Sequence, residues 1–118
     1  MRPNDHDASF LWDMREAAGD IVEFTQNLTF NEFEQDKKCR YAVERQIAVL
    51  GEAAKRISEA FTVAHPEIPW EGIVSQRNVI AHEYGEILVE RIWRVATERI
   101  PDLIEILDRL TPQPPQGD

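Results

Sequence analysis

Cysteine is nearly absent from this 118-residue chain, because Cys39 is the only one. A single thiol cannot form an internal disulfide, and the polar residues 1–7 do not resemble a secretory signal. The longest apolar stretches are only a few residues, far short of the roughly 20 that a membrane-spanning helix needs. We therefore expect a cytoplasmic protein without a membrane span.

Positive charge is also scarce, since 13 basic residues stand against 22 acidic ones and give a net charge of −9. Such a chain repels a nucleic-acid backbone at long range unless cations gather locally. This argues against a general nucleic-acid binder but leaves room for an enzyme with a small positive cleft. We interpret most basic residues as solvated beside carboxylates such as Glu44 and Glu90. Those considered are Lys37, Lys38, Arg40, Arg45, Arg91, Arg94 and Arg99.

Metal-ligand patterns are missing as well, because no paired histidines and no Cys/His spacing of the usual kind occur. We expect no metal and no cofactor. There is no strand signal and no internal repeat either. What the chain does contain is apolar residues at helical spacing.

The first apolar stripe predicts a helix over residues 7–28, and residues 27–31 predict a turn. Asn31, with Glu34 three residues later, predicts the cap of a long second helix. That helix carries a regular stripe, which we interpret as bundle core. The stripe consists of Val43, Ile47, Leu50, Ala54, Ile57 and Phe61. Gly51 lies inside this predicted helix, where glycine costs about 1 kcal/mol of stability relative to alanine. A close crossing with another helix is the usual compensation for that cost.

Pro69 suits the first turn of a shorter third helix that runs to about Ala81. After Gly85, a last apolar stripe predicts a fourth helix over residues 88–110. Pro101 lies inside that stripe, so we expect a kink or a short break at residues 98–100. These elements predict an all-α, up-and-down bundle of four helices, or five if Pro101 splits the last.

The chain length fits one domain. We expect a flexible N-terminus over residues 1–6, a helical domain over 7–110 and a disordered, proline-rich tail over 111–118.

The segment 77–84 places an arginine, an asparagine, a histidine and a tyrosine within two turns of helix. Imidazole titrates near pH 6.5 and can accept a proton from a ribose 2′-hydroxyl or return one to a leaving oxygen. The guanidinium fork matches the oxygens of a phosphate under attack. Arg77 and His82 are therefore candidates for RNA cleavage without a metal. Structural pinning of a helix end is an equally plausible role for these two residues taken alone.

At about 100° per residue, His82 lies about 140° around the helix from Arg77. Either the helix loosens at His82, as Gly85 permits, or a second subunit completes the site across a two-fold axis. We favour the second subunit, and both effects can coexist. The other two histidines, His6 in the N-terminal segment and His65 beside a proline, are interpreted as structural or incidental.

The segment from Arg77 to Tyr84 resembles the signature of the HepT-like branch of the HEPN superfamily, which is an arginine, four residues, a histidine, one residue and a tyrosine. The segments 42–46 and 51–56 resemble the family's second helix, and residues 68–70 precede the arginine as in the family. Together the resemblance covers nearly the whole chain apart from its two ends.

The resemblance implies an all-helical homodimer that acts as a metal-independent endoribonuclease, with Arg77 and His82 as catalytic pair and Asn78 in support. It also implies a toxin of a toxin-antitoxin pair, whose partner is a minimal nucleotidyltransferase (MNT) that transfers AMP to Tyr84. Phosphate in the cleft would then repel RNA. The net charge of −9 motivates an alternative, in which the chain is a non-catalytic module that binds a nucleotide or docks the nucleotidyltransferase. An orphan helical dimer is a third possibility.

Overall fold

The structure is a computed structural model that describes residues 3–82 and 85–112. These residues form seven α-helices and one π-helical turn, with no strand among them. The elements are α1 (Asp5–Thr25), α2 (Phe30–Gln35), α3 (Lys37–Lys55), α4 (Glu59–Ala64), α5 (Trp70–His82), α6 (Gly85–Arg94), η1 (Val95–Arg99) and α7 (Ile100–Leu110). The expected all-helical bundle is confirmed. The tail beyond residue 112 lies outside the described residues, and so do residues 83 and 84.

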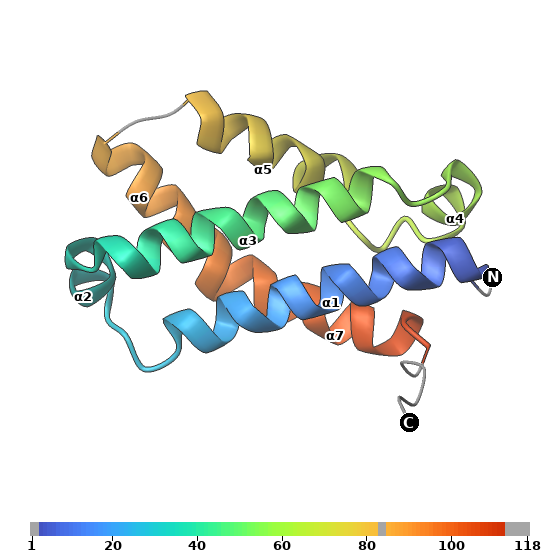
Figure 1. Ribbon diagram of the computed structural model, residues 1–118, viewed down its shortest axis with the longest axis horizontal. Coiled ribbons are helices and arrows are strands. Elements are labelled where there is room, and N and C mark those ends of the chain that lie inside the picture. Colours follow the sequence, from blue (N-terminus) through green and yellow to red (C-terminus); the bar gives the residue numbers. More distant parts are fainter. Residues whose placement is uncertain (1–2, 83–84, 113–118) are drawn as a thin grey trace.

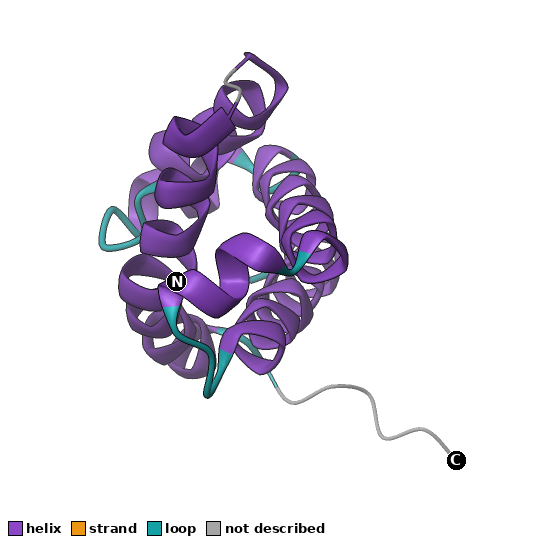
Figure 2. Cartoon of the chain, turned by 90° about the vertical axis from the view of Figure 1, so that its left-hand side faces the viewer, coloured by secondary structure: helices purple, strands orange, loops and turns teal. Residues whose placement is uncertain are grey.

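The long helices pack as neighbours that alternate in direction. Figure 1 shows α1 and α3 side by side and antiparallel, with α5 on the other side of α3 and α7 behind α1. In the end-on view of Figure 2 the long helices surround the interior, and α2 crosses the near end. No described helix is long and apolar enough to cross a membrane.

The core is built mainly by α1, α3 and the continuous segment α6, η1 and α7, with one large aromatic side chain each from α2 and α4. Its largest fully buried side chains include Phe33, Phe61, Leu11, Met14, Ile21, Ile92 and Leu107. In α5, by contrast, Ile73 is the only buried side chain among those described, and Ile87 near the start of α6 is 64 % exposed. The outer parts of α5 and α6 therefore form surface rather than core.

The start of α1 is fixed by two polar contacts. The Asn4 side chain caps the helix by accepting a hydrogen bond from the Asp7 backbone N–H at 2.7 Å. The buried Asp7 carboxylate accepts hydrogen bonds from the backbone N–H and the hydroxyl of Ser58, at 2.8 and 2.6 Å. His6 lies within the helix, and its side-chain Nε2 atom is 3.2 Å from the Arg56 carbonyl oxygen. Helix α1 thus begins at Asp5.

The end of α1 and the start of the next helix differ from the sequence-based prediction. Helix α1 ends at Thr25, and Asn27 adopts a left-handed φ of 67°, so Leu28 lies beyond the helix. The predicted cap at Asn31 is wrong. Thr29 and Glu32 form the capping box instead, because the Thr29 hydroxyl accepts from the Glu32 N–H while the Glu32 carboxylate accepts from the Thr29 N–H.

The predicted long second helix is three helices in the structure. Asp36 ends α2 and caps α3 through the Cys39 N–H, and Ser58 caps α4 through the Phe61 N–H. All six residues of the predicted stripe are nevertheless buried. Burial followed from the apolar spacing, whereas the breaks follow from short polar side chains that compete for backbone hydrogen bonds.

The last helical segment distorts just before Pro101, as the sequence predicted. The distortion is a π-helical turn, Val95–Arg99, rather than a break, and Pro101 occupies the first turn of α7. Proline lacks the N–H that an α-helical bond needs, and its ring clashes with the carbonyl one turn earlier. The wider π turn relieves that clash while the helix continues.

Gly51 lies where α3 crosses α5. A Cβ atom at Gly51 would stand 3.3 Å from the Ile73 carbonyl oxygen and 3.6 Å from the Arg77 Cβ. The expected close approach of two backbones is confirmed, and it places the α5 residue Arg77 directly against α3.

The crossing predicts opposite effects of one substitution at two helical glycines. Gly72→Ala should stabilise the fold by up to about 1 kcal/mol through helix propensity, because its Cβ would meet only the Pro69 Cβ at 3.9 Å. Gly51→Ala should instead destabilise the fold by about 1 kcal/mol. The new Cβ would press against the Ile73 carbonyl oxygen, which is backbone and cannot move aside cheaply, and this clash outweighs the gain in helix propensity. Urea denaturation measures both. Equal stabilisation by the two substitutions would contradict the close crossing.

Candidate functional site

Helix α5 carries the residues that the sequence singled out. Pro69 precedes the helix, and the Trp70 indole N–H fixes its start by donating to the His65 carbonyl oxygen at 2.9 Å. Arg77, Asn78 and His82 are all exposed on this helix. Tyr84 and Glu83 lie outside the described residues.

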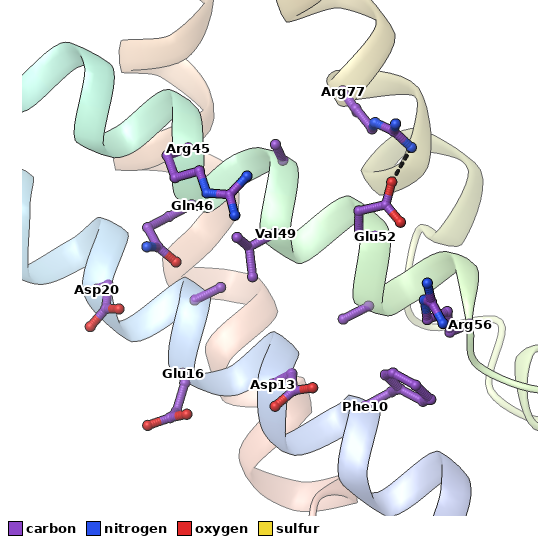
Figure 3. Close-up of a pocket in the computed structure, with 13 residues that line it drawn as sticks. Phe10, Asp13, Glu16, Asp20, Arg45, Gln46, Val49, Glu52, Arg56 and Arg77 are labelled. Carbon is purple, nitrogen blue, oxygen red and sulfur yellow. Dashed lines mark ion pairs between the residues drawn. The ribbon is translucent and has the colours of Figure 1, made fainter.

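The Arg77 guanidinium is held by a carboxylate from the neighbouring helix. It forms an ion pair with Glu52 of α3, next to the crossing at Gly51, and the two side chains are 48 % and 42 % exposed (Figure 3). Sequence reasoning missed Glu52 as a partner of Arg77. The available signal was its position directly after Gly51, which already indicated that α3 and α5 approach there.

Arg77 borders a cavity of about 440 Å³ in the groove between α1 and α3. Figure 3 shows carboxylates of α1 along one side and arginines of α3 and α5 along the other. The charged lining residues are Asp13, Glu16, Asp20, Arg45, Glu52, Arg56 and Arg77. Because carboxylates and guanidinium groups are mixed, this cavity is no simple anion site.

His82 does not join Arg77 in this cavity. It is the last residue of α5, it is not among the residues that line the groove, and its side chain makes no hydrogen bond or ion pair with any described residue. Helix α5 remains α-helical through His82, so the expected loosening does not occur within the described part of the helix. The two groups therefore point about 140° apart on one regular helix.

The remaining histidines have structural surroundings. His65 is buried, its ring stacks beside Phe61 at a centroid distance of 4.4 Å, and its Nδ1 lies 3.3 Å from the Glu67 carboxylate. The His6 ring contacts Phe10 edge-on at 4.9 Å. Both contacts agree with the structural role expected from the sequence.

Three groups with shifted pKa values do not line this cavity. A hydrogen bond from its own backbone N–H, and then His65, lower the pKa of the Glu67 carboxyl. Burial raises the pKa of the Glu44 carboxyl against the opposing effect of Arg40, and burial together with Asp36 raises that of the Cys39 thiol. Among the described residues no cluster of three or more histidine, cysteine, aspartate or glutamate side chains could hold a metal ion.

The family follows from comparison with known proteins. The model of the family described as ribonuclease HepT-like matches residues 14–110. The chain belongs to the ribonuclease HepT-like family. Similar relatives of this HepT-like chain include a protein of Thermococcus cleftensis named "Probable ribonuclease HepT", 39 % identical over 80 % of this chain and 86 % of the relative.

Two proteins of Methanocaldococcus jannaschii, named as candidate RNases, are each 37 % identical to this HepT-like chain. The alignments cover 86 % and 80 % of this chain, and 84 % and 87 % of the relatives. No solved structure matches the chain significantly. The recognition of the family from its motifs is confirmed.

The Arg77–Glu52 pair of this HepT-like protein should be easy to break. Both side chains are about half exposed, and such pairs contribute at most about 1 kcal/mol. A double-mutant cycle with Arg77→Gln and Glu52→Gln, measured by urea denaturation, should give a coupling free energy of about 0.5 kcal/mol that shrinks as salt is added. A coupling above about 2 kcal/mol would show a guanidinium too firmly held to turn to a substrate.

Proposed function

We propose that this HepT-like chain is a metal-independent endoribonuclease, and that Arg77 of one subunit and His82 of the partner subunit form its active site in a homodimer. The observation that carries the proposal is the geometry of α5. Both groups are exposed, yet they diverge on a helix that stays regular through His82. Two-fold symmetry supplies a second copy of each group, so a shared cleft can unite what one chain separates.

The proposed reaction uses the ribose 2′-hydroxyl as nucleophile. The His82 imidazole accepts the 2′-hydroxyl proton while O2′ attacks the adjacent phosphorus. The bond from phosphorus to the 5′-oxygen breaks, and the protonated His82 imidazole returns its proton to that oxygen, which leaves as a 5′-hydroxyl. The other product is a 2′,3′-cyclic phosphate. Arg77 binds the non-bridging oxygens and stabilises the charge that builds on them.

Two further features support this assignment. Asn78 is exposed on α5 and lies about 40° around the helix from His82, so its side-chain amide can donate to a phosphate bound at the His82 side of the shared cleft. The ion pair between Arg77 and Glu52 is exposed and therefore expected to be weak. A phosphate can then compete with Glu52 for the Arg77 guanidinium.

The dimer is proposed to form through the outer parts of α5 and α6. Ile87 is 64 % exposed there, while Val79 and Ile80 are only half-buried within one chain. Apolar side chains left at the surface next to the candidate site are suited to a second copy of the same surface.

We further propose a role as the toxin of a cytoplasmic HEPN/MNT toxin-antitoxin pair. The nucleotidyltransferase partner would neutralise the enzyme by joining the Tyr84 phenol oxygen to the α-phosphate of ATP, with loss of the phenol proton and release of pyrophosphate. The added phosphodiester would carry negative charge two residues from His82 and repel the RNA backbone.

A non-catalytic module that binds a nucleotide or docks the nucleotidyltransferase is the second candidate. The overall charge of −9 and the cavity of about 440 Å³ beside Arg77, within the size range of small-molecule sites, favour it. Under this alternative the purified protein binds its partner or a nucleotide and leaves RNA intact.

Mixed dimers test the shared active site. Homodimers of Arg77→Ala and of His82→Ala should each cleave RNA at least about 100-fold more slowly than the unsubstituted protein, with chelator present throughout. A heterodimer of the two variants, purified through two different tags, contains one complete site and should regain about half of the full activity. A folded heterodimer as inactive as both homodimers would refute the shared site.

Tyr84→Phe separates neutralisation from catalysis. The variant should cleave RNA at close to the normal rate, because the phenol oxygen takes no part in the proposed reaction. After co-expression with a nucleotidyltransferase encoded beside it, only the unsubstituted protein should carry an AMP adduct by mass spectrometry and lose activity. An adduct on Tyr84→Phe, or full activity of the Tyr84 adduct, would contradict this mechanism.

A further inference from the structure

A second cavity, of about 220 Å³, lies between α5 and the segment formed by α6 and η1. Its lining carries three guanidinium groups and one carboxylate, although the chain as a whole has a net charge of −9. The residues that line it are Gln76, Ile87, Glu90, Arg91, Arg94, Val95 and Arg99. Positive charge is therefore gathered here against the overall balance of the protein.

The π turn explains how three arginines reach one cavity. In an unbroken α-helix Arg99 would lie about 80° around from Arg91 and about 140° from Arg94. The π turn Val95–Arg99 accommodates about one additional residue and so rotates Arg99 back by about 100°. Arg99 then lies between the directions of Arg91 and Arg94, which agrees with all three lining the cavity.

Arg91, Arg94 and Arg99 form no ion pair with the residues that the structure describes. The ion pairs found there join Arg15 to Asp108, His65 to Glu67 and Arg77 to Glu52. None involves Arg91, Arg94 or Arg99, even though Glu90 lines the same cavity. Three guanidinium groups repel one another, and an anion with several oxygens, such as a phosphodiester, relieves that repulsion by accepting their forked hydrogen bonds.

The cavity shares helix α5 with the proposed active site. Gln76 precedes Arg77 on α5, and α6 follows the segment that contains His82. An RNA strand that extends along α5 from the proposed active site would therefore meet the cavity between α5 and α6. The Gln76 amide adds a neutral donor and acceptor at the wall of this path.

We propose that Arg91, Arg94 and Arg99 bind a phosphodiester of the RNA substrate other than the one that is cleaved. This inference rests on the proposed ribonuclease function and names a second contact for the same substrate. It accounts for how so acidic a protein holds RNA, since the positive charge is confined to one small cavity.

The experiment compares two double variants that each remove two positive charges. Arg91→Gln/Arg99→Gln alters the cavity, whereas Lys55→Gln/Arg109→Gln changes exposed residues at the ends of α3 and α7. The probe is a short single-stranded RNA with 2′-O-methyl groups, which cannot be cleaved because it lacks the nucleophile. Binding is titrated at several salt concentrations, and cleavage of the unmodified RNA is followed in parallel.

The cavity variant should bind the probe on the order of 10-fold more weakly, and its plot of log affinity against log salt should be shallower by about 1.4, or about 0.7 for each lost contact. KM for unmodified RNA should rise while kcat stays unchanged. The control variant should keep both the affinity and the slope of the unsubstituted protein.

The outcomes separate this inference from the proposed function. Normal cleavage with equal slopes for both double variants would overturn the phosphodiester contact and leave the ribonuclease intact. Probe binding that is lost only in the cavity variant, without any cleavage, would support the contact and refute the ribonuclease. If the cavity variant changes the sedimentation of the protein alone and not the salt slope, the arginines bind protein, and the inference fails.

Discussion

The close crossing of α3 and α5 at Gly51 is the contact on which the position of Arg77 depends. Because glycine has no Cβ, the Ile73 carbonyl of α5 can approach the α3 backbone, and the Arg77 Cβ lies against the same point. The next residue, Glu52, then meets the guanidinium. Only one side of α5 is tied to the bundle in this way, so its outer half stays free to form a surface.

The packing of the helices also determines which charges surround each arginine. The chain is strongly acidic, and its arginines occupy two different settings. Arg77 shares an exposed groove with carboxylates of α1 and α3, where ion pairs are weak and exchangeable. Arg91, Arg94 and Arg99 face a cavity in which one carboxylate stands against three guanidinium groups. A negative net charge and local affinity for phosphate are compatible because screening limits long-range repulsion to about 10 Å in ordinary salt.

Much of the fold could be predicted from apolar spacing, and the failures share one cause. The stripe that includes Val43 and Phe61 was correctly assigned to the core, and Pro69 correctly marked the start of α5. The helix breaks at Asp36 and Ser58 were missed. Several polar side chains in each segment can cap a helix, and packing decides which one does: Ser58 is selected because the buried Asp7 of α1 fixes its backbone and hydroxyl.

The sequence by itself determined the all-helical class, the core residues, the family and the residue types in the segment 77–84, since periodicity and motif order are properties of the chain alone. Tertiary structure decided that Glu52 holds Arg77, that His82 lies away from it, and that a π turn before Pro101 brings Arg99 round to Arg91 and Arg94. Such relations depend on the rotation and crossing of helices. One additional residue in a helix rotates the following side chains by about 100° and so moves them to another face. No local sequence pattern determines that rotation.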